Sequence, residues 1–115
     1  MKYRSTRDFS QEAVSAQAIA QGICEDGGLF VPETFPKLTQ QDFNFLQNAD
    51  YQTRAQKILS MYLTDFSVDE IEDCVRKAYT EEKFPGGPAP LSLVNIDSAN
   101  LYLLELWHGP TCAFK

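Results

Sequence analysis

The sequence predicts an α+β fold built from helices and short strands. Three stretches between residues 10 and 82 repeat apolar residues at the three- and four-residue spacing of one helix face. Two apolar runs of strand length, residues 91–96 and 101–106, follow a segment rich in proline and glycine. We therefore expect the helices of residues 50–82 to pack beside a small sheet.

The first third of the chain predicts short strands around one helix. Residues 2–6 are of strand length, and Ser10 can cap a helix that should end near Gly22. The segment 26–28, Asp-Gly-Gly, predicts a turn because glycine tolerates the backbone angles that tight turns need. Residues 29–31 then predict a short buried strand.

Two helices are predicted in the middle of the chain. Thr39 and Asp42 resemble a capping box, in which each side chain accepts a hydrogen bond from the other residue's amide. This pattern predicts a helix from there to about Gln47. Residues 51–64 predict a longer helix, because their apolar positions fall on one face of a 3.6-residue period.

The fourth predicted helix has the clearest start signal in the chain. Ser67 can accept a hydrogen bond from the Glu70 amide, while the Glu70 carboxylate can accept one from the Ser67 amide. The buried face of this helix is expected to comprise Ile71, Cys74, Val75, Ala78 and Tyr79.

We expect the whole chain, residues 1–115, to form a single N-terminal domain. Residues 1–83 should be its mostly helical part. Residues 84–90 should be a linker, because the prolines there cannot continue a helix. Residues 91–115 should form a hairpin with a buried second strand, turning at residues 97–100 and leading to the C-terminal lysine.

Composition excludes several classes of partner. The net charge is −6 with a pI near 4.6, which argues against nucleic acid and against an anionic membrane surface, since both need clustered basic residues. The three cysteines, Cys24, Cys74 and Cys112, form no metal-binding or disulfide pattern. The sequence shows neither a signal peptide nor a long apolar span, so we expect a cytoplasmic protein.

Three motifs closely resemble those of threonine synthases. The strongest is the segment 104–115, LELWHGPTCAFK, which matches ten of the first twelve positions of the family signature LELFHGPTLAFKD. The departures are Trp107 in place of Phe and Cys112 in place of Leu. Residues 3–7, YRSTR, are similar to the family's opening YxSTR, and residues 22–32 to its DGGL segment.

The resemblance implies the first part of an enzyme of the tryptophan-synthase-β-like fold that depends on pyridoxal 5′-phosphate (PLP). Such an enzyme converts O-phospho-L-homoserine and water into L-threonine and phosphate. The resemblance assigns Lys115 as both the catalytic residue and the residue that binds PLP covalently, and it implies no metal. Further contacts would come from the remainder of the polypeptide, so we expect the isolated 115 residues to be inactive and without stably bound PLP.

Two other functions are also compatible with the sequence. A threonine-synthase-like phospho-lyase would share these motifs but release phosphate to give a keto acid. A non-catalytic interaction domain would carry Lys115 only as an exposed terminal residue, which is the usual situation of a lysine.

Three features near the motifs have both a functional and a structural interpretation. His108 is either an acid–base group or a histidine held by structural hydrogen bonds. Thr111 either bonds the backbone at the Gly-Pro turn or lines the cofactor cleft. The Ser5-Thr6-Arg7 segment either contacts a substrate phosphate or ends a strand with a surface ion pair.

Overall fold

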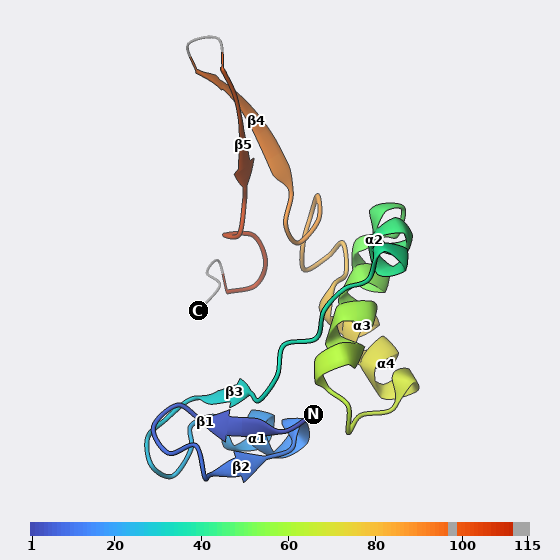
Figure 1. Cartoon of the computed structure of the whole chain (residues 1–115). Coiled ribbons are helices and arrows are strands. Elements are labelled where there is room, and N and C mark those ends of the chain that lie inside the picture. Colours follow the sequence, from blue (N-terminus) through green and yellow to red (C-terminus); the bar gives the residue numbers. More distant parts are fainter. Residues whose placement is uncertain (97–98, 112–115) are drawn as a thin grey trace. The chain divides into compact units, whose positions relative to one another are not determined.

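The structure is a computed structural model, which describes residues 1–96 and 99–111 (Figure 1). Within these residues the chain has helices and two separate antiparallel sheets. The predicted α+β class is therefore confirmed, with two small sheets in place of the expected single one. The chain divides into two compact units, Met1–Asp73 and Cys74–Lys115.

The first unit opens with a three-stranded sheet. Strand β1 (Tyr3–Ser5) lies in the middle, between β2 (Glu12–Ala13) and β3 (Phe30–Pro32). The register pairs Tyr3 with Pro32 and with Ala13 on its two sides. The strands predicted at residues 2–6 and 29–31 are thereby confirmed, but the predicted burial of the second is wrong at its start, because Leu29 is 61% exposed.

Helix α1 (Ser15–Gln21) begins later than predicted. Ser10 does not cap it, because residues 12–13 form β2 and the Ser10 hydroxyl donates to Asp8 Oδ1 at 2.7 Å. The cap comes instead from Asp65, whose carboxylate accepts from the amides of Ser15 (3.2 Å) and Ala16 (2.9 Å). The predicted end near Gly22 is confirmed, and that glycine has a φ of 76°.

Helices α2 (Gln40–Gln47) and α3 (Tyr51–Tyr62) form close to where they were predicted. The capping box ahead of α2 is present, with the Thr39 hydroxyl accepting from the Asp42 amide at 3.2 Å and the Asp42 carboxylate accepting from the Thr39 amide at 2.9 Å. Asp50 caps α3 by accepting from the Thr53 amide at 2.8 Å.

Helix α4 (Val68–Ala78) starts at the predicted box, where the Glu70 carboxylate accepts from the Ser67 amide at 2.8 Å. Ile71 and Val75 are buried as predicted, each 3% exposed. Cys74 and Ala78 are exposed, so their predicted burial is wrong. The physical reason is that only one i, i+4 row of this helix is covered, and these two residues lie on the neighbouring row.

The second unit contains the hairpin of β4 (Leu91–Ile96) and β5 (Ala99–Leu104). The register pairs Leu91 with Leu104 and Ile96 with Ala99. The predicted hairpin is confirmed, but Ala99 and Asn100 belong to the strand, and the predicted turn residues Asp97 and Ser98 lie outside the described residues. The predicted burial of the second strand is wrong, because every residue of β5 is exposed.

Few side chains of the described part of the chain are fully buried. Among apolar residues there they are Ala13, Cys24, Ile71 and Val75, and among polar ones Ser5 and Ser15. The two serines, each 1% exposed, are both bonded to a carboxylate, of Asp26 and Asp65 respectively. Polar contacts between distant segments therefore organise the first unit as much as apolar packing does.

Candidate functional site

The residue predicted to bind the cofactor, Lys115, lies outside the described residues, as do Cys112, Ala113 and Phe114. The structure describes the segment that leads to it as far as Thr111. This segment leaves β5 after Leu104, and the Glu105 amide still donates to the Pro90 carbonyl at 3.0 Å. The hairpin thus fixes the start of the segment.

A cluster of three polar side chains lies where the chain leaves the hairpin. The Glu105 carboxylate accepts a hydrogen bond from the Ser92 hydroxyl through Oε1, and its Oε2 lies 2.6 Å from His108 Nε2. Both contacts favour the ionised carboxylate, and the Ser92 bond, followed by the His108 bond, holds the pKa of Glu105 below its ordinary value. The arrangement fixes the imidazole of His108 three residues after Glu105.

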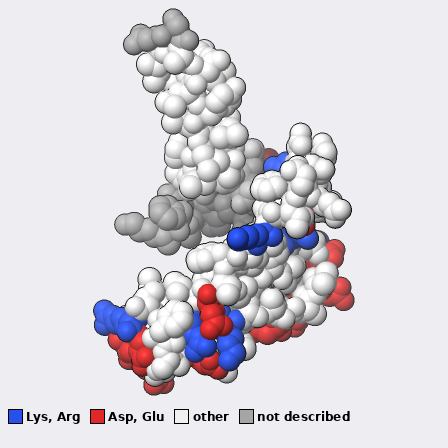
Figure 2. Space-filling view, viewed as in Figure 1, with Lys and Arg blue, Asp and Glu red and all other residues white. Residues whose placement is uncertain are grey.

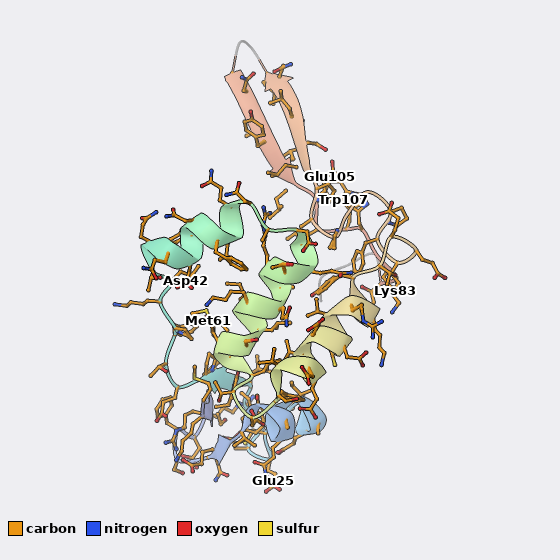
Figure 3. The ribbon with its side chains drawn as sticks, turned by 90° about the vertical axis from the view of Figure 1, so that its right-hand side faces the viewer. Glu25, Asp42, Met61, Lys83, Glu105 and Trp107 are labelled. Carbon is orange, nitrogen blue, oxygen red and sulfur yellow. The ribbon has the colours of Figure 1, made fainter. Side chains whose placement is uncertain are left out.

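The sequence pointed to His108 but not to its contact with Glu105, nor to the hydrogen bond that Ser92 donates to that carboxylate. The sequence contained one sign of this contact, because Glu105 is the single carboxylate that interrupts an otherwise apolar strand. Antiparallel pairing places Ser92 opposite Leu103, so Glu105, two residues further along, shares that face. Figure 3 labels Glu105 and Trp107 at the foot of the hairpin, and the Trp107 and His108 rings lie 5.6 Å apart.

A close contact holds the turn that follows His108. Gly109 has a φ of 98°, which favours glycine, and a Cβ there would lie 2.3 Å from Cε1 of Phe84. The Phe84 ring in turn lies 5.8 Å from the ring of Tyr79. The predicted linker therefore contributes an aromatic side chain that packs directly on the turn ahead of Thr111, which itself is exposed.

The two N-terminal motifs meet in the first unit. The buried Ser5 hydroxyl donates to both oxygens of the Asp26 carboxylate, at 2.7 and 2.9 Å. The Gly28 amide donates to Asp26 Oδ1 at 2.7 Å. These bonds, that of Ser5 first, lower the pKa of Asp26. Gly28 lies so close that a Cβ on it would be 2.1 Å from Ser5 Oγ.

The other two residues of the Ser5-Thr6-Arg7 segment also hold the DGGL segment. Thr6 Oγ1 accepts from the Leu29 amide at 3.0 Å, and the Arg7 guanidinium donates to the Asp26 carbonyl at 3.2 Å. This arrangement favours the structural interpretation over a substrate-phosphate contact. The expected surface ion pair involves a different arginine, Arg4, which lies 2.8 Å from Glu12 and 3.0 Å from Glu33.

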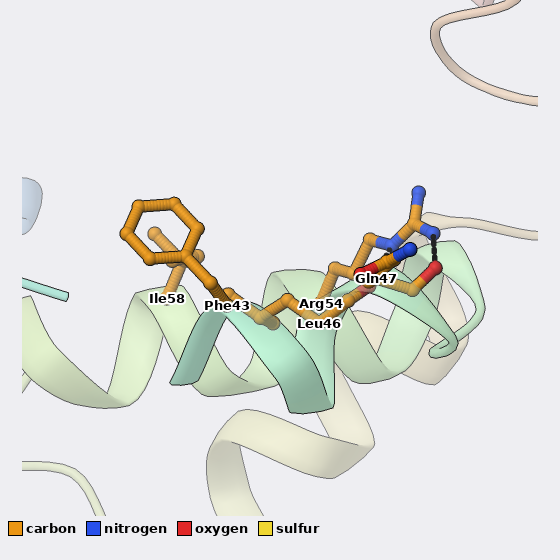
Figure 4. Close-up of a pocket in the computed structure, with 5 residues that line it drawn as sticks. All are labelled: Phe43, Leu46, Gln47, Arg54 and Ile58. Carbon is orange, nitrogen blue, oxygen red and sulfur yellow. Dashed lines mark hydrogen bonds between the residues drawn. The ribbon is translucent and has the colours of Figure 1, made fainter. Parts of the chain in front are cut away.

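One open groove of about 640 Å³ lies between α2 and α3 (Figure 4). It is lined by Phe43, Leu46, Gln47, Arg54 and Ile58. Arg54 is the one charged residue in this lining. Its guanidinium already donates hydrogen bonds to the carbonyls of Leu46 (2.8 Å) and Gln47 (3.2 Å) at the end of α2. Within the described residues, no group of three or more histidine, cysteine, aspartate or glutamate side chains is arranged to hold a metal ion.

Two solved structures that superimpose on this chain are threonine synthases. The crystal structure of the Escherichia coli enzyme superimposes with a TM-score of 0.79 at 32% identity, over 96% of this chain and 24% of that one. The PLP-bound threonine synthase of Brucella melitensis gives a TM-score of 0.80 at 34% identity, over 99% and 24%. The curated threonine synthase of Saccharomyces cerevisiae is 36% identical over 98% of this chain and 23% of its own length.

These matches define the structural class, because the chain folds like one part of a larger threonine synthase and spans about a quarter of the length of these relatives. Residues 2–79 match the family model described as the threonine synthase N terminus. The chain belongs to that family, as the resemblance implied. No helix in the described part of the chain is long and apolar enough to cross a membrane.

Proposed function

We propose that this chain is the N-terminal part of a cytoplasmic threonine synthase that converts O-phospho-L-homoserine and water into L-threonine and phosphate. The observation that carries the proposal is the match over nearly the whole chain to a threonine synthase whose structure is PLP-bound. The names of the relatives favour this activity over a phospho-lyase and over a non-catalytic interaction domain. The activity belongs to a protein about four times as long as this chain.

Lys115 would hold the cofactor, because it is the lysine that ends the LELWHGPTCAFK segment. PLP, when bound, supplies an electron sink for the substrate carbons. The side chain of Lys115 fits PLP chemically, because its primary amine is the kind of group that bonds covalently to the aldehyde of PLP. The described segment ahead of Lys115 also fits, because the contact of Gly109 with Phe84 and the contact of His108 with Glu105 fix the chain that presents it.

Lys115 would have two tasks during a turnover. Its amine must be neutral to bond to the cofactor, so its surroundings in the whole enzyme must disfavour the ammonium. Once the amine of the substrate has displaced it, the free lysine can take a proton from one substrate carbon and return it to another. His108, held by Glu105, is not needed for that transfer, and we assign it to positioning the Gly-Pro turn.

The 115 residues alone are expected to bind no PLP stably and to release no phosphate. One lysine cannot hold the cofactor by itself, because its phosphate and its ring also need partners, which would come from the remainder of the polypeptide. Adding PLP to the isolated chain should therefore give no stoichiometric visible absorption band. A stable band, or phosphate release from O-phospho-L-homoserine, would contradict this expectation.

The test of the proposed function is a chimera in which this chain replaces the matched first quarter of the E. coli enzyme. The chimera should release phosphate from O-phospho-L-homoserine and form threonine, whereas a phospho-lyase would form a keto acid. Borohydride reduction followed by peptide mapping should label Lys115. The variant Lys115→Ala should lose both activity and label, with Lys83→Ala as the matched control; a label on another lysine would refute the assignment.

A further inference from the structure

The β4–β5 hairpin presents apolar side chains on both of its faces. In an antiparallel pair, directly opposite residues share a face and successive residues alternate between faces. The register therefore defines two apolar sets. The first face carries Leu91, Leu93, Tyr102 and Leu104, and the second carries Val94, Ile96, Leu101 and Leu103.

Most of these side chains are open to solvent. On the first face Leu93 is 51% and Tyr102 63% exposed, and on the second face Ile96 is 51% and Leu101 46% exposed. A continuous exposed apolar patch marks an interaction site, and strands that are apolar on both sides are typical of sheets covered on both sides. A lone two-stranded hairpin is also only marginally stable in water.

We propose that the hairpin is an interaction surface, both faces of which are covered by the polypeptide that corresponds to the other three-quarters of a threonine synthase. The identity of this partner rests on the proposed function. The lengths of the relatives support it, because this chain accounts for only 23–25% of them. A two-stranded sheet also leaves an unpaired edge on each side, to which strands of that polypeptide can add.

Two other occupants fit the hairpin less well. The described residues of β4 and β5 include no charged side chain, so nothing on them attracts a nucleic acid or a charged peptide (Figure 2). A second copy of the chain would form a two-fold interface from one self-complementary patch. Such an interface covers one face of the hairpin and leaves the other exposed. The partner must therefore supply two different surfaces.

Hydroxyl-radical footprinting tests this inference without any measurement of activity. The modification rate of Tyr102 is compared between the 115-residue chain and the chimera with the E. coli enzyme, and Phe43, which is 54% exposed in the groove of the first unit, serves as control. We expect the rate at Tyr102 to fall at least fivefold in the chimera and the rate at Phe43 to change less than twofold. An unchanged rate at Tyr102 would overturn the inference, and so would an equal fall at both residues.

The free chain gives a second test that does not depend on how the chimera folds. Because Leu93 and Tyr102 lie open to solvent, the variants Leu93→Ser and Tyr102→Ser should leave its melting temperature unchanged. In sedimentation the chain should remain a monomer. A marked loss of stability would show that its own residues cover the hairpin, and a dimer with a protected Tyr102 would identify a second copy as the occupant; either result overturns the inference. An inactive chimera with Tyr102 protected would count against the proposed function alone.

Discussion

The substitution Gly28→Ala tests whether the two N-terminal motifs are held together by close contact. Gly28 is buried beside the Ser5–Asp26 hydrogen bond, and its φ is not in the left-handed region, so alanine can adopt the same backbone. The added methyl group would nevertheless lie 2.1 Å from Ser5 Oγ and 3.0 Å from the Arg7 amide nitrogen. We expect Gly28→Ala to force the YRSTR and DGGL segments apart.

The size of the effect follows from two opposing contributions. Inserting a methyl group into a closely packed site costs about 1–3 kcal/mol. Replacing glycine by alanine stabilises the folded state by about 0.4–1 kcal/mol, because alanine lowers the conformational entropy of the unfolded chain. The net destabilisation should therefore be about 1–2 kcal/mol, which corresponds to roughly a 5- to 30-fold change in the local opening equilibrium.

Amide hydrogen exchange provides a local measurement of that opening. The Thr6 amide donates to the Leu29 carbonyl at 2.9 Å, and the Leu29 amide donates to Thr6 Oγ1 at 3.0 Å. The exchange of both amide protons therefore reports on the contact between the YRSTR and DGGL segments. Their protection should fall about 5- to 30-fold in Gly28→Ala, in line with the free energy derived above.

A double-mutant cycle isolates the steric contact. Combining Gly28→Ala with Ser5→Ala removes the oxygen that the new methyl group would meet, so the double variant should be more stable than the sum of the single effects by at least about 0.5 kcal/mol. The control cycle pairs Ser5→Ala with Gly22→Ala, because no heavy atom lies within 4 Å of a Cβ at Gly22, and that cycle should be additive. Additivity in the Gly28 cycle would refute the steric argument.

Two further predictions concern helix starts. Ser67→Ala should destabilise α4 by about 1 kcal/mol, because its hydroxyl accepts from the Glu70 amide, and Ser67→Asp should retain most of the stability in chemical denaturation. Hydrogen bonds, that from Ser15 first and then that from Ala16, lower the pKa of Asp65 in the folded chain below its ordinary value of 3.8. The ionised carboxylate therefore stabilises the fold at pH values above 3.8. This stabilisation is lost as the pH falls through the lowered pKa of the folded state. The protection of the Ser15 and Ala16 amides, taken relative to their intrinsic exchange rates at each pH, should therefore fall below about pH 4 in the native chain. Asp65→Asn should show lower protection at neutral pH and lose this acid dependence. Identical pH profiles of protection would count against the Asp65 cap.

Local signals in the sequence predicted the elements that are stabilised by their own neighbours. The boxes at Thr39 and Ser67 lie within three residues of their partners, so the starts of α2 and α4 were predictable. The start of α1 was not, because its cap comes from Asp65, fifty residues away from Ser15. The single-domain organisation of residues 1–115 stays a prediction.

Burial was harder to predict than secondary structure, and the hairpin shows why. An apolar run predicts that a strand will be covered, but it does not say which polypeptide covers it. Leu101 to Leu104 have the apolar pattern of a buried strand and are nevertheless exposed in this chain. The prediction that this strand is buried is therefore wrong for the 115-residue chain. The same exposed apolar side chains are the observation that supports the hairpin as an interaction surface.

The three motifs that carry the family resemblance have different physical roles. Two of them contact each other, since the Ser5 hydroxyl of the first donates to the Asp26 carboxylate of the second through a partly buried hydrogen bond. This contact stabilises the fold of the first unit. The third contains the lysine whose amine suits the proposed chemistry, and Glu105 and Phe84 brace the residues that lead to it. A residue's place in a family motif therefore does not by itself make it a contact for substrate. In this chain the geometry assigns Ser5 and Thr6 to the support of the fold, whereas the proposed role of Lys115 rests on its place in the motif.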